Sequence, residues 1–156
     1  NEILTRIKAA GVIPTPFYTY VYYHGNKWVD YGYDKMENMF AHKSFLDAGI
    51  PVAPASDYTP GPYEPMMAIH SMVTRKDIRG REWGPSQKIS VSDAMRICTI
   101  HGAYASFEES IKGSLVAGKL ADFVILEKDP HEVNLDEIVN IKVLKTVLGG
   151  NTTFEA

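Results

Sequence analysis

Apolar residues recur at the spacing of a helix face in several stretches before residue 105. The pattern predicts helices over residues 2–10, 34–48, 66–75 and 93–104. Gly11 and Gly49 follow the first two stretches and are typical of residues that end helices. Ser90 or Ser92 can cap the last helix. Most of this part of the chain is therefore predicted to be helical.

Two short apolar runs separate these helices and have the composition of strands. Residues 12–15 are rich in β-branched residues, although Pro14 and Pro16 cannot donate hydrogen bonds to a neighbouring strand. Residues 50–56 form a continuous apolar run, which is typical of a strand buried on both faces. Helices that alternate with strands indicate parallel βα units. Two strands cannot make a complete sheet, so we expect their pairing partners to lie outside this chain.

Beyond about residue 110 the pattern changes to that of a small β-rich unit. Strands are predicted over residues 121–127, 141–148 and 152–154, and residues 135–138 can form one helical turn. Gly149, Gly150 and Asn151 supply a hairpin turn between the last two strands. An uncovered strand edge tends to recruit another chain, so we expect a homo-oligomer or a partner chain at the open sheet edges.

Composition and charge exclude several classes of protein. The 156 residues have a net charge of −3, and their lysines and arginines are scattered, so no nucleic-acid partner is expected. No apolar run approaches the roughly 20 residues of a membrane span, so no membrane partner is expected. The single cysteine, Cys98, excludes an internal disulfide and suits the reducing cytoplasm. Its position within a predicted helix favours a buried, unreactive thiol.

Three motifs follow one another along the chain: LDAGIPVAPASDYTP (46–60), AMRICTIHGAYAS (94–106) and GSLVAGKLADFVILEKDP (113–130). Together they resemble segments of the metal-dependent amidohydrolases, in the branch often called amidohydrolase family 3. The resemblance implies an α/β fold. Residues 1–108 would form the last βα units of a TIM-type (β/α)8 barrel, and residues 109–156 would form a segment of a small β-sandwich. Gly113, Lys119 and Asp122 would then have structural roles.

Asp57, in the sequence ASDYTP, is the candidate catalytic and metal-binding residue. The resemblance implies that this aspartate binds a divalent metal, often zinc, at the last barrel strand and accepts the proton of the attacking water. An aspartate at the carboxyl end of a buried parallel strand also lies on the face where barrel enzymes build their active sites. The alternative is that Asp57 only turns the chain before Pro60.

The histidines depart from the family pattern, in which a His-x-His pair supplies metal ligands, because no such pair occurs here. His24, in the sequence YYHGNKW, is a candidate substrate-binding residue, with a structural role as the alternative. We expect His42 on a helix surface and His101 in a hydrogen bond. Because zinc takes about four ligands, no metal is expected to bind this chain alone.

Three functions remain open from the sequence. In the first, the chain is the C-terminal segment of an amidohydrolase that hydrolyses the C–N bond of a small-molecule amide or cyclic amide, and it is inactive by itself. In the second, it is a small self-associating module for binding or assembly. In the third, it is one half of a split hydrolase whose partner chain supplies the metal ligands. The three motifs together favour the first.

Overall fold

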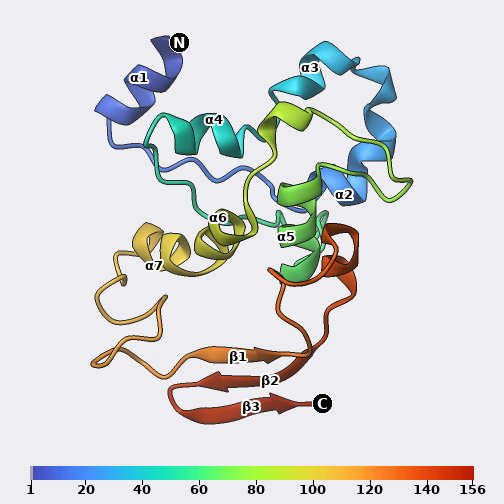
Figure 1. Ribbon diagram of the computed structural model, residues 1–156. Helices are drawn as coiled ribbons and strands as arrows, with labels where there is room; N and C mark the ends of the chain where they lie inside the picture. The colour runs from blue at the N-terminus through green and yellow to red at the C-terminus, as the bar shows by residue number, and fades with distance from the viewer. Residues whose placement is uncertain (1) are drawn as a thin grey trace.

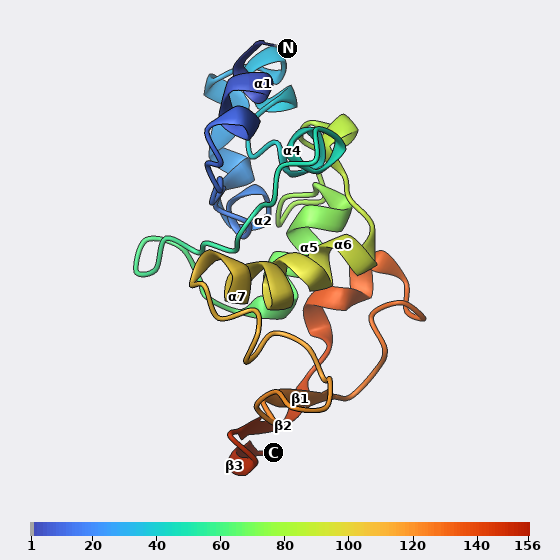
Figure 2. The ribbon, with the colours of Figure 1, turned by 90° about the vertical axis from the view of Figure 1, so that its left-hand side faces the viewer.

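Figure 1 shows the computed structural model, which describes residues 2–156. Helices fill one end of the molecule, and a three-stranded sheet that carries the C-terminus lies at the other end (Figures 1 and 2). The α-helices are α1 (Glu2–Ala9), α2 (Tyr20–His24), α3 (Tyr33–Glu37), α4 (His42–Asp47), α5 (Pro65–Thr74), α6 (Val91–Arg96) and α7 (Gly102–Ala105). No helix among the described residues is long and apolar enough to cross a membrane.

Short 3-10 and π turns complete the helical part. They are η1 (Gly25–Asp30), η2 (Pro85–Gln87), η3 (Ile97–His101) and η4 (Leu135–Asn140). The predicted helices near the N-terminus and at 66–75 are confirmed as α1 and α5, and the one at 93–104 is confirmed as α6, η3 and α7 in direct succession. Ser90 rather than Ser92 is its cap, since the Ser90 hydroxyl accepts from the amide of Asp93 at 3.0 Å.

The single helix predicted over residues 34–48 is wrong, because the chain breaks between α3 and α4, where Phe40 has a φ of +52°. The cause lies at the end of α5. The buried guanidinium of Arg75 donates, at 3.4, 2.9 and 3.3 Å, to the backbone carbonyls of Met36, Met39 and Phe40. Carbonyls that a continuous helix would satisfy internally are thus bound by a side chain from a distant part of the sequence.

The two strands predicted before α2 and after α4 are also wrong as regular strands, but the two extended segments run side by side in parallel. The amide of Ala53 donates to the carbonyl of Pro14 at 3.0 Å, and the amide of Tyr18 donates to the carbonyl of Ala55 at 3.1 Å. Proline has no N–H, so the first segment lacks donors for a continuous ladder. Each segment is therefore the other's neighbour, and the expectation that further pairing partners lie outside this chain stays a prediction.

Two hydrophobic cores hold the helices together. The smaller core is largely aromatic and contains Val21, Trp28, Met36 and Trp83. The larger core joins α5, α6 and η4, and its buried members include Val52, Ile69, Met72, Ile97, Ile138 and Ile141. This core contains residues from both sides of position 108. A shared core neither supports nor excludes a boundary there, so the division into segments 1–108 and 109–156 stays a prediction.

The sheet contains β1 (Phe123–Leu126), β2 (Val143–Leu148) and β3 (Asn151–Glu155), all antiparallel, in the order β1-β2-β3. Thr146 of β2 lies opposite Val124 on one side and Phe154 on the other. Gly149 and Gly150 form the turn between β2 and β3 with φ values of +56° and +81°, which favour glycine. The predicted strands, hairpin and helical turn of this region are confirmed.

Three residues of the helical part test narrower expectations. His42 is only 2% exposed, so the predicted surface position is wrong. The break before α4 turns this first helical residue inward, where its Nδ1 lies 2.9 Å from the carbonyl of Phe40. His101 lies with its Nδ1 3.0 Å from the carbonyl of Val52, which confirms the expected hydrogen bond. Burial raises the pKa of the Cys98 thiol to about 12, in agreement with an unreactive side chain.

A candidate active site around Asp57

The two parallel segments determine where the candidate residues lie. The first segment ends at Phe17, shortly before α2, and the second ends just before Asp57. Parallel segments have their carboxyl ends at the same edge, so α2 and Asp57 meet there. The structure thereby brings Asp57 and His24 to one end of the parallel pair, although 32 residues separate them in the sequence.

Asp57 itself lies in a tight turn. Its φ is +57°, and its carbonyl accepts a hydrogen bond from the amide of Gly61 at 2.8 Å. A Cβ at position 61 would collide with the carbonyl oxygen of Ser56 and with the ring of Tyr20, so the turn requires glycine there. The turn therefore lies directly against α2 and leaves the Asp57 side chain exposed.

Tyr20, the first residue of α2, binds the Asp57 carboxylate. The phenol donates to Oδ2 at 2.5 Å, whereas Oδ1 has no hydrogen-bond partner among the described residues. The hydrogen bond to Asp57 raises the pKa of Tyr20 to about 12, because it stabilises the neutral phenol. Tyr20 therefore remains a donor at neutral pH, and one carboxylate oxygen remains free to bind a ligand.

His24 lies one helical turn beyond Tyr20, and the two rings meet edge to face with centroids 4.7 Å apart. Its Nε2 lies 3.4 Å from the carbonyl of Pro60, and its Nδ1 lies 3.1 Å from Nζ of Lys27. A carbonyl only accepts and an ammonium only donates, so both contacts suit a neutral ring that carries its proton on Nε2. His24 is thus close to the Asp57 turn, and substrate binding by His24 stays a prediction.

The arrangement fits a metal ligand at Asp57, but only one. The free Oδ1 sits on an exposed turn, and carboxylate oxygen is an ordinary ligand for zinc. Within residues 2–156, no group of three or more histidine, cysteine, aspartate or glutamate side chains is placed to hold an ion. A complete site of about four ligands would need further groups from outside these residues.

Comparison with known proteins identifies the family. The sequence profile of the amidohydrolase family matches residues 2–154. This chain belongs to the amidohydrolase family. The family 3-like assignment made from the three sequence motifs is thereby confirmed.

Relatives of this amidohydrolase chain are considerably longer than it is. The N-substituted formamide deformylase of Arthrobacter pascens is 34% identical over 117 residues, which make up 75% of this chain and 22% of the relative. The putative amidohydrolase YtcJ of Bacillus subtilis is 30% identical over 127 residues, or 80% of this chain and 24% of the relative. This amidohydrolase chain thus spans about a quarter of the length of these curated relatives.

The fold agrees with that of a solved hydrolase. The crystal structure of an uncharacterized metal-dependent hydrolase from Pyrococcus horikoshii matches with a TM-score of 0.73 at 20% identity, over 87% of this chain and 28% of that one. At this identity the similarity shows the fold alone. The amidohydrolase chain therefore has the fold of part of such a hydrolase, with helices and a three-stranded antiparallel sheet.

The third motif, residues 113–130, has a structural role in this amidohydrolase chain. Gly113 has a φ of +88°, and a Cβ there would lie 2.7 Å from Cβ of Ala103. Lys119 donates to the hydroxyl of Ser114 at 2.8 Å, and Asp122 accepts from the amide of Gly149 at 2.6 Å. The contacts of Gly113 and Lys119 fix the loop before β1, and the contact of Asp122 fixes the turn between β2 and β3. All three residues thus have structural roles, as predicted.

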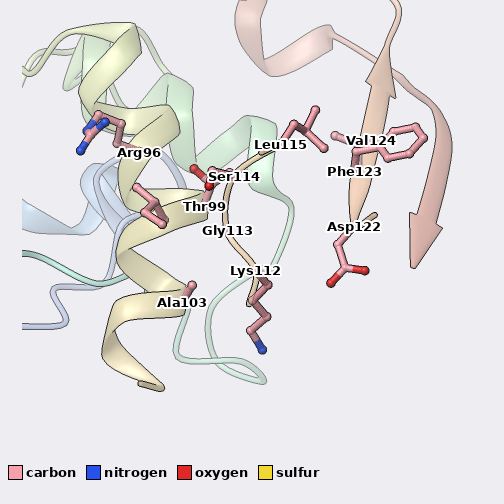
Figure 3. Close-up of a pocket in the computed structure, with 11 residues that line it drawn as sticks. Arg96, Thr99, Ala103, Lys112, Gly113, Ser114, Leu115, Asp122, Phe123 and Val124 are labelled. Carbon is pink, nitrogen blue, oxygen red and sulfur yellow. The ribbon is translucent and has the colours of Figure 1, made fainter. Parts of the chain in front are cut away.

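A cavity of about 720 Å³ lies beside this motif rather than beside Asp57. Figure 3 shows the loop at Gly113 and Ser114 between the helix that carries Thr99 and the strand that carries Phe123. Neither Asp57 nor His24 lines it. This cavity is therefore a space between the helices and the sheet, away from the Asp57 turn.

Sequence reasoning missed two residues of the site. Tyr20 belongs to a run of tyrosines that could line a pocket wall, but nothing in the run distinguishes it from Tyr18 or Tyr22. The signal lies in its spacing, because Tyr20 and His24 are one helical turn apart and so share a helix face. Gly61 lies in a loop rich in turn residues, where the sequence does not distinguish a glycine required by a close contact from an ordinary turn glycine.

Proposed function

We propose that this chain carries part of the active site of an amidohydrolase that cleaves the C–N bond of a small-molecule amide or cyclic amide. The observation that supports this most is the exposed Asp57 carboxylate at the carboxyl ends of the parallel segments, with Oδ2 bound by Tyr20 and Oδ1 free. Family membership and the deformylase relative, named for an N-substituted formamide, favour C–N bond cleavage.

In this proposal Asp57 has two roles, as a metal ligand and as the general base. A divalent metal, for which we propose zinc, would lower the pKa of a water toward roughly 7 and polarise the amide carbonyl. Asp57 accepts the proton that this water loses when it attacks the carbonyl carbon. It then returns a proton to the departing nitrogen, so that the carboxylate is restored at the end of the cycle.

His24 is the proposed substrate-binding residue. Its ring lies between Tyr20 and the carbonyl of Pro60, at the edge of the Asp57 turn. A substrate amide that displaces the weak 3.4 Å contact to Pro60 would meet an Nε2–H donor aimed at its carbonyl oxygen. We place this reaction in the cytoplasm, since a chain with a single cysteine suits a reducing compartment.

The remaining metal ligands would come from polypeptide outside the described residues. A longer chain would supply them in an ordinary amidohydrolase, and a partner chain would supply them in a split hydrolase. A second candidate function, a self-associating module, is supported by the sheet, whose outer strands β1 and β3 each pair only with β2 in the described residues. Such a module would need neither metal nor substrate.

The proposed role of Asp57 is tested in the full-length or assembled enzyme that contains this chain. Asp57→Asn keeps the size and the Tyr20 hydrogen bond but cannot accept a proton, so turnover of an N-substituted formamide should fall by about 10²-fold or more. Asp47→Asn is the matched control, because Asp47 is an exposed aspartate of α4 whose ionic partner in the described part of the chain is Lys43. Turnover of Asp57→Asn close to that of Asp47→Asn would remove Asp57 from the mechanism.

A further inference from the structure

The Tyr20 hydroxyl is the only side-chain partner of the Asp57 carboxylate among the described residues. A carboxylate rotates readily about its last torsion, and without a partner its two oxygens exchange places. The 2.5 Å hydrogen bond from Tyr20 distinguishes them, because it engages Oδ2 and leaves Oδ1 unpaired. One phenol therefore fixes the orientation of the Asp57 carboxylate and the direction in which its unpaired oxygen faces.

The Tyr20 ring is itself held in place on several sides. Its centroid lies 5.0 Å from that of Phe17, 4.7 Å from that of His24 and 5.8 Å from that of Phe40. The backbone of Gly61 lies so close to the ring that a Cβ there would come within 2.7 Å of Cε1. Packing of this kind fixes the direction of the hydroxyl before any ligand arrives.

We propose that Tyr20 is a positioning residue that orients Asp57, holding Oδ2 so that Oδ1 is presented as the metal ligand. This inference rests on the proposed function of Asp57. Residues that hydrogen-bond a metal ligand orient it, and their loss typically costs about 10- to 100-fold in metal affinity or activity. Tyr20 would act in that range, without touching the substrate or the metal itself.

The test uses the full-length enzyme and compares Tyr20→Phe with Tyr23→Phe. Tyr20→Phe removes the hydroxyl and keeps the packed ring. Tyr23→Phe removes the same atom from the same helix, where the ring also meets His24, at 4.8 Å, but makes no hydrogen bond to Asp57. We expect Tyr20→Phe to lower kcat by about 10- to 100-fold with KM changed by less than about threefold.

The second readout is the affinity for Zn²⁺ alone, measured by competition with a chromophoric chelator. We expect Tyr20→Phe to weaken it by about tenfold and Tyr23→Phe to leave it unchanged. The proposal is overturned if Tyr20→Phe matches the wild type in kcat and zinc affinity, if it changes only KM, or if Tyr23→Phe loses as much. A fall in the thermal midpoint of Tyr20→Phe beyond about 5 °C would assign the hydroxyl to stability and also overturn it.

The outcome for Asp57→Asn separates this inference from the proposed function. If Asp57→Asn is inactive while Tyr20→Phe is normal in kcat and zinc affinity, Asp57 keeps its role and only the positioning role of Tyr20 fails. If Asp57→Asn is fully active, the proposed function fails first, and a loss in Tyr20→Phe would then have to come from elsewhere.

Discussion

His42 shows how one buried side chain can make stability depend on pH. Its Nδ1 donates to the carbonyl of Phe40, and its Nε2 is buried without a hydrogen-bond partner within residues 2–156. Burial lowers the pKa of His42 to about 4, and the positive charge of Arg75 adds to this effect, while the hydrogen bond to Phe40 opposes it. The folded protein therefore holds His42 neutral under conditions in which an unfolded histidine takes up a proton.

We expect the protein to lose stability as the pH falls from about 6.5, the value for an unfolded histidine, toward about 4. The folded-state pKa is the lower one, so the contribution of His42 is fully present above 6.5 and is lost on acidification, by on the order of 3 kcal/mol in total. Burial also lowers the pKa of His70, which adds in the same direction. Urea unfolding at a series of pH values measures how steeply the free energy of unfolding falls as the pH decreases.

In that series the free energy of unfolding of His42→Leu should fall less steeply with decreasing pH than that of the wild type. Gln87→Leu is the control, because Gln87 is also buried and contacts α4 but carries no titratable group, so its pH dependence should match that of the wild type. A His42→Leu protein with an unchanged slope would mean that His42 does not stay neutral in the folded state.

The sequence pointed to Asp57 as a candidate because its neighbours form a local motif, and it did not point to Tyr20 because the hydrogen bond between them spans 37 positions. Arg75 illustrates the same limit. Nothing near it in the sequence indicates that its guanidinium binds carbonyls of Met36, Met39 and Phe40. Residues that act through contacts close in sequence could be predicted, and residues that act through tertiary contacts could not.

At the scale of elements, helices and strands that are stabilised by contacts close in sequence were predicted correctly, and those that depend on distant contacts were not. β2 and β3 pair through a two-residue turn, and α6 begins at its own cap, Ser90, so both were predicted. The helix over 34–48 failed because Arg75 competes for its carbonyls. The parallel segments failed as strands because their prolines remove donors from the ladder.

Two glycines in the loop before β1 allow the cost of backbone strain to be separated from the cost of a close packing contact. Gly113 and Gly118 both have a positive φ, of +88° and +94°, so alanine strains the backbone at either position. At Gly113 the added Cβ would also lie 2.7 Å from Cβ of Ala103 and 3.0 Å from Cα of Ile100, whereas at Gly118 nothing lies within 4 Å. We expect Gly118→Ala to cost about 1 kcal/mol of unfolding free energy and Gly113→Ala about 1–3 kcal/mol more.

Denaturant unfolding of the two variants gives both costs under the same conditions. The difference between them isolates the packing contact from the backbone strain that they share. Equal costs would show that the loop moves away from α7 freely, and that the closeness of Gly113 to Ala103 does not stabilise the fold.

At the scale of the whole molecule, the sheet is attached to the helices mainly through η4. Ile138 of η4 is fully buried in the larger core, and Lys76 pairs with Asp136 at 2.7 Å. An apolar cavity of about 360 Å³ remains between the sheet and helices α5 and α6, with Met66, Phe123 and Val147 in its lining. The position of the sheet thus depends on contacts far apart in sequence, which is why its strands could be predicted but its placement could not.

Several large apolar side chains are exposed on the sheet and in the loop that precedes it. Val124, Leu148 and Phe154 are 51%, 60% and 48% exposed, and Leu115 in the preceding loop is 74% exposed. The outer edges of β1 and β3 have no paired strand among the described residues. Exposed apolar surface beside unpaired strand edges tends to recruit another chain, and in a pure sample the chain available is a second copy.

We therefore predict that this 156-residue chain self-associates at micromolar concentration, in sedimentation velocity or light scattering. Val124→Lys should shift the distribution toward monomer, because a charge on an edge strand opposes pairing with another strand. Ile78→Lys is the matched control, since Ile78 is a 60% exposed apolar residue in a loop of the helical part and its replacement should leave association unchanged. A wild-type monomer of 17.4 kDa that unfolds cooperatively would contradict the prediction. It would mean that the sheet and helices close the apolar cavity between them in solution, and that β1 and β3 are stable edges without a second chain.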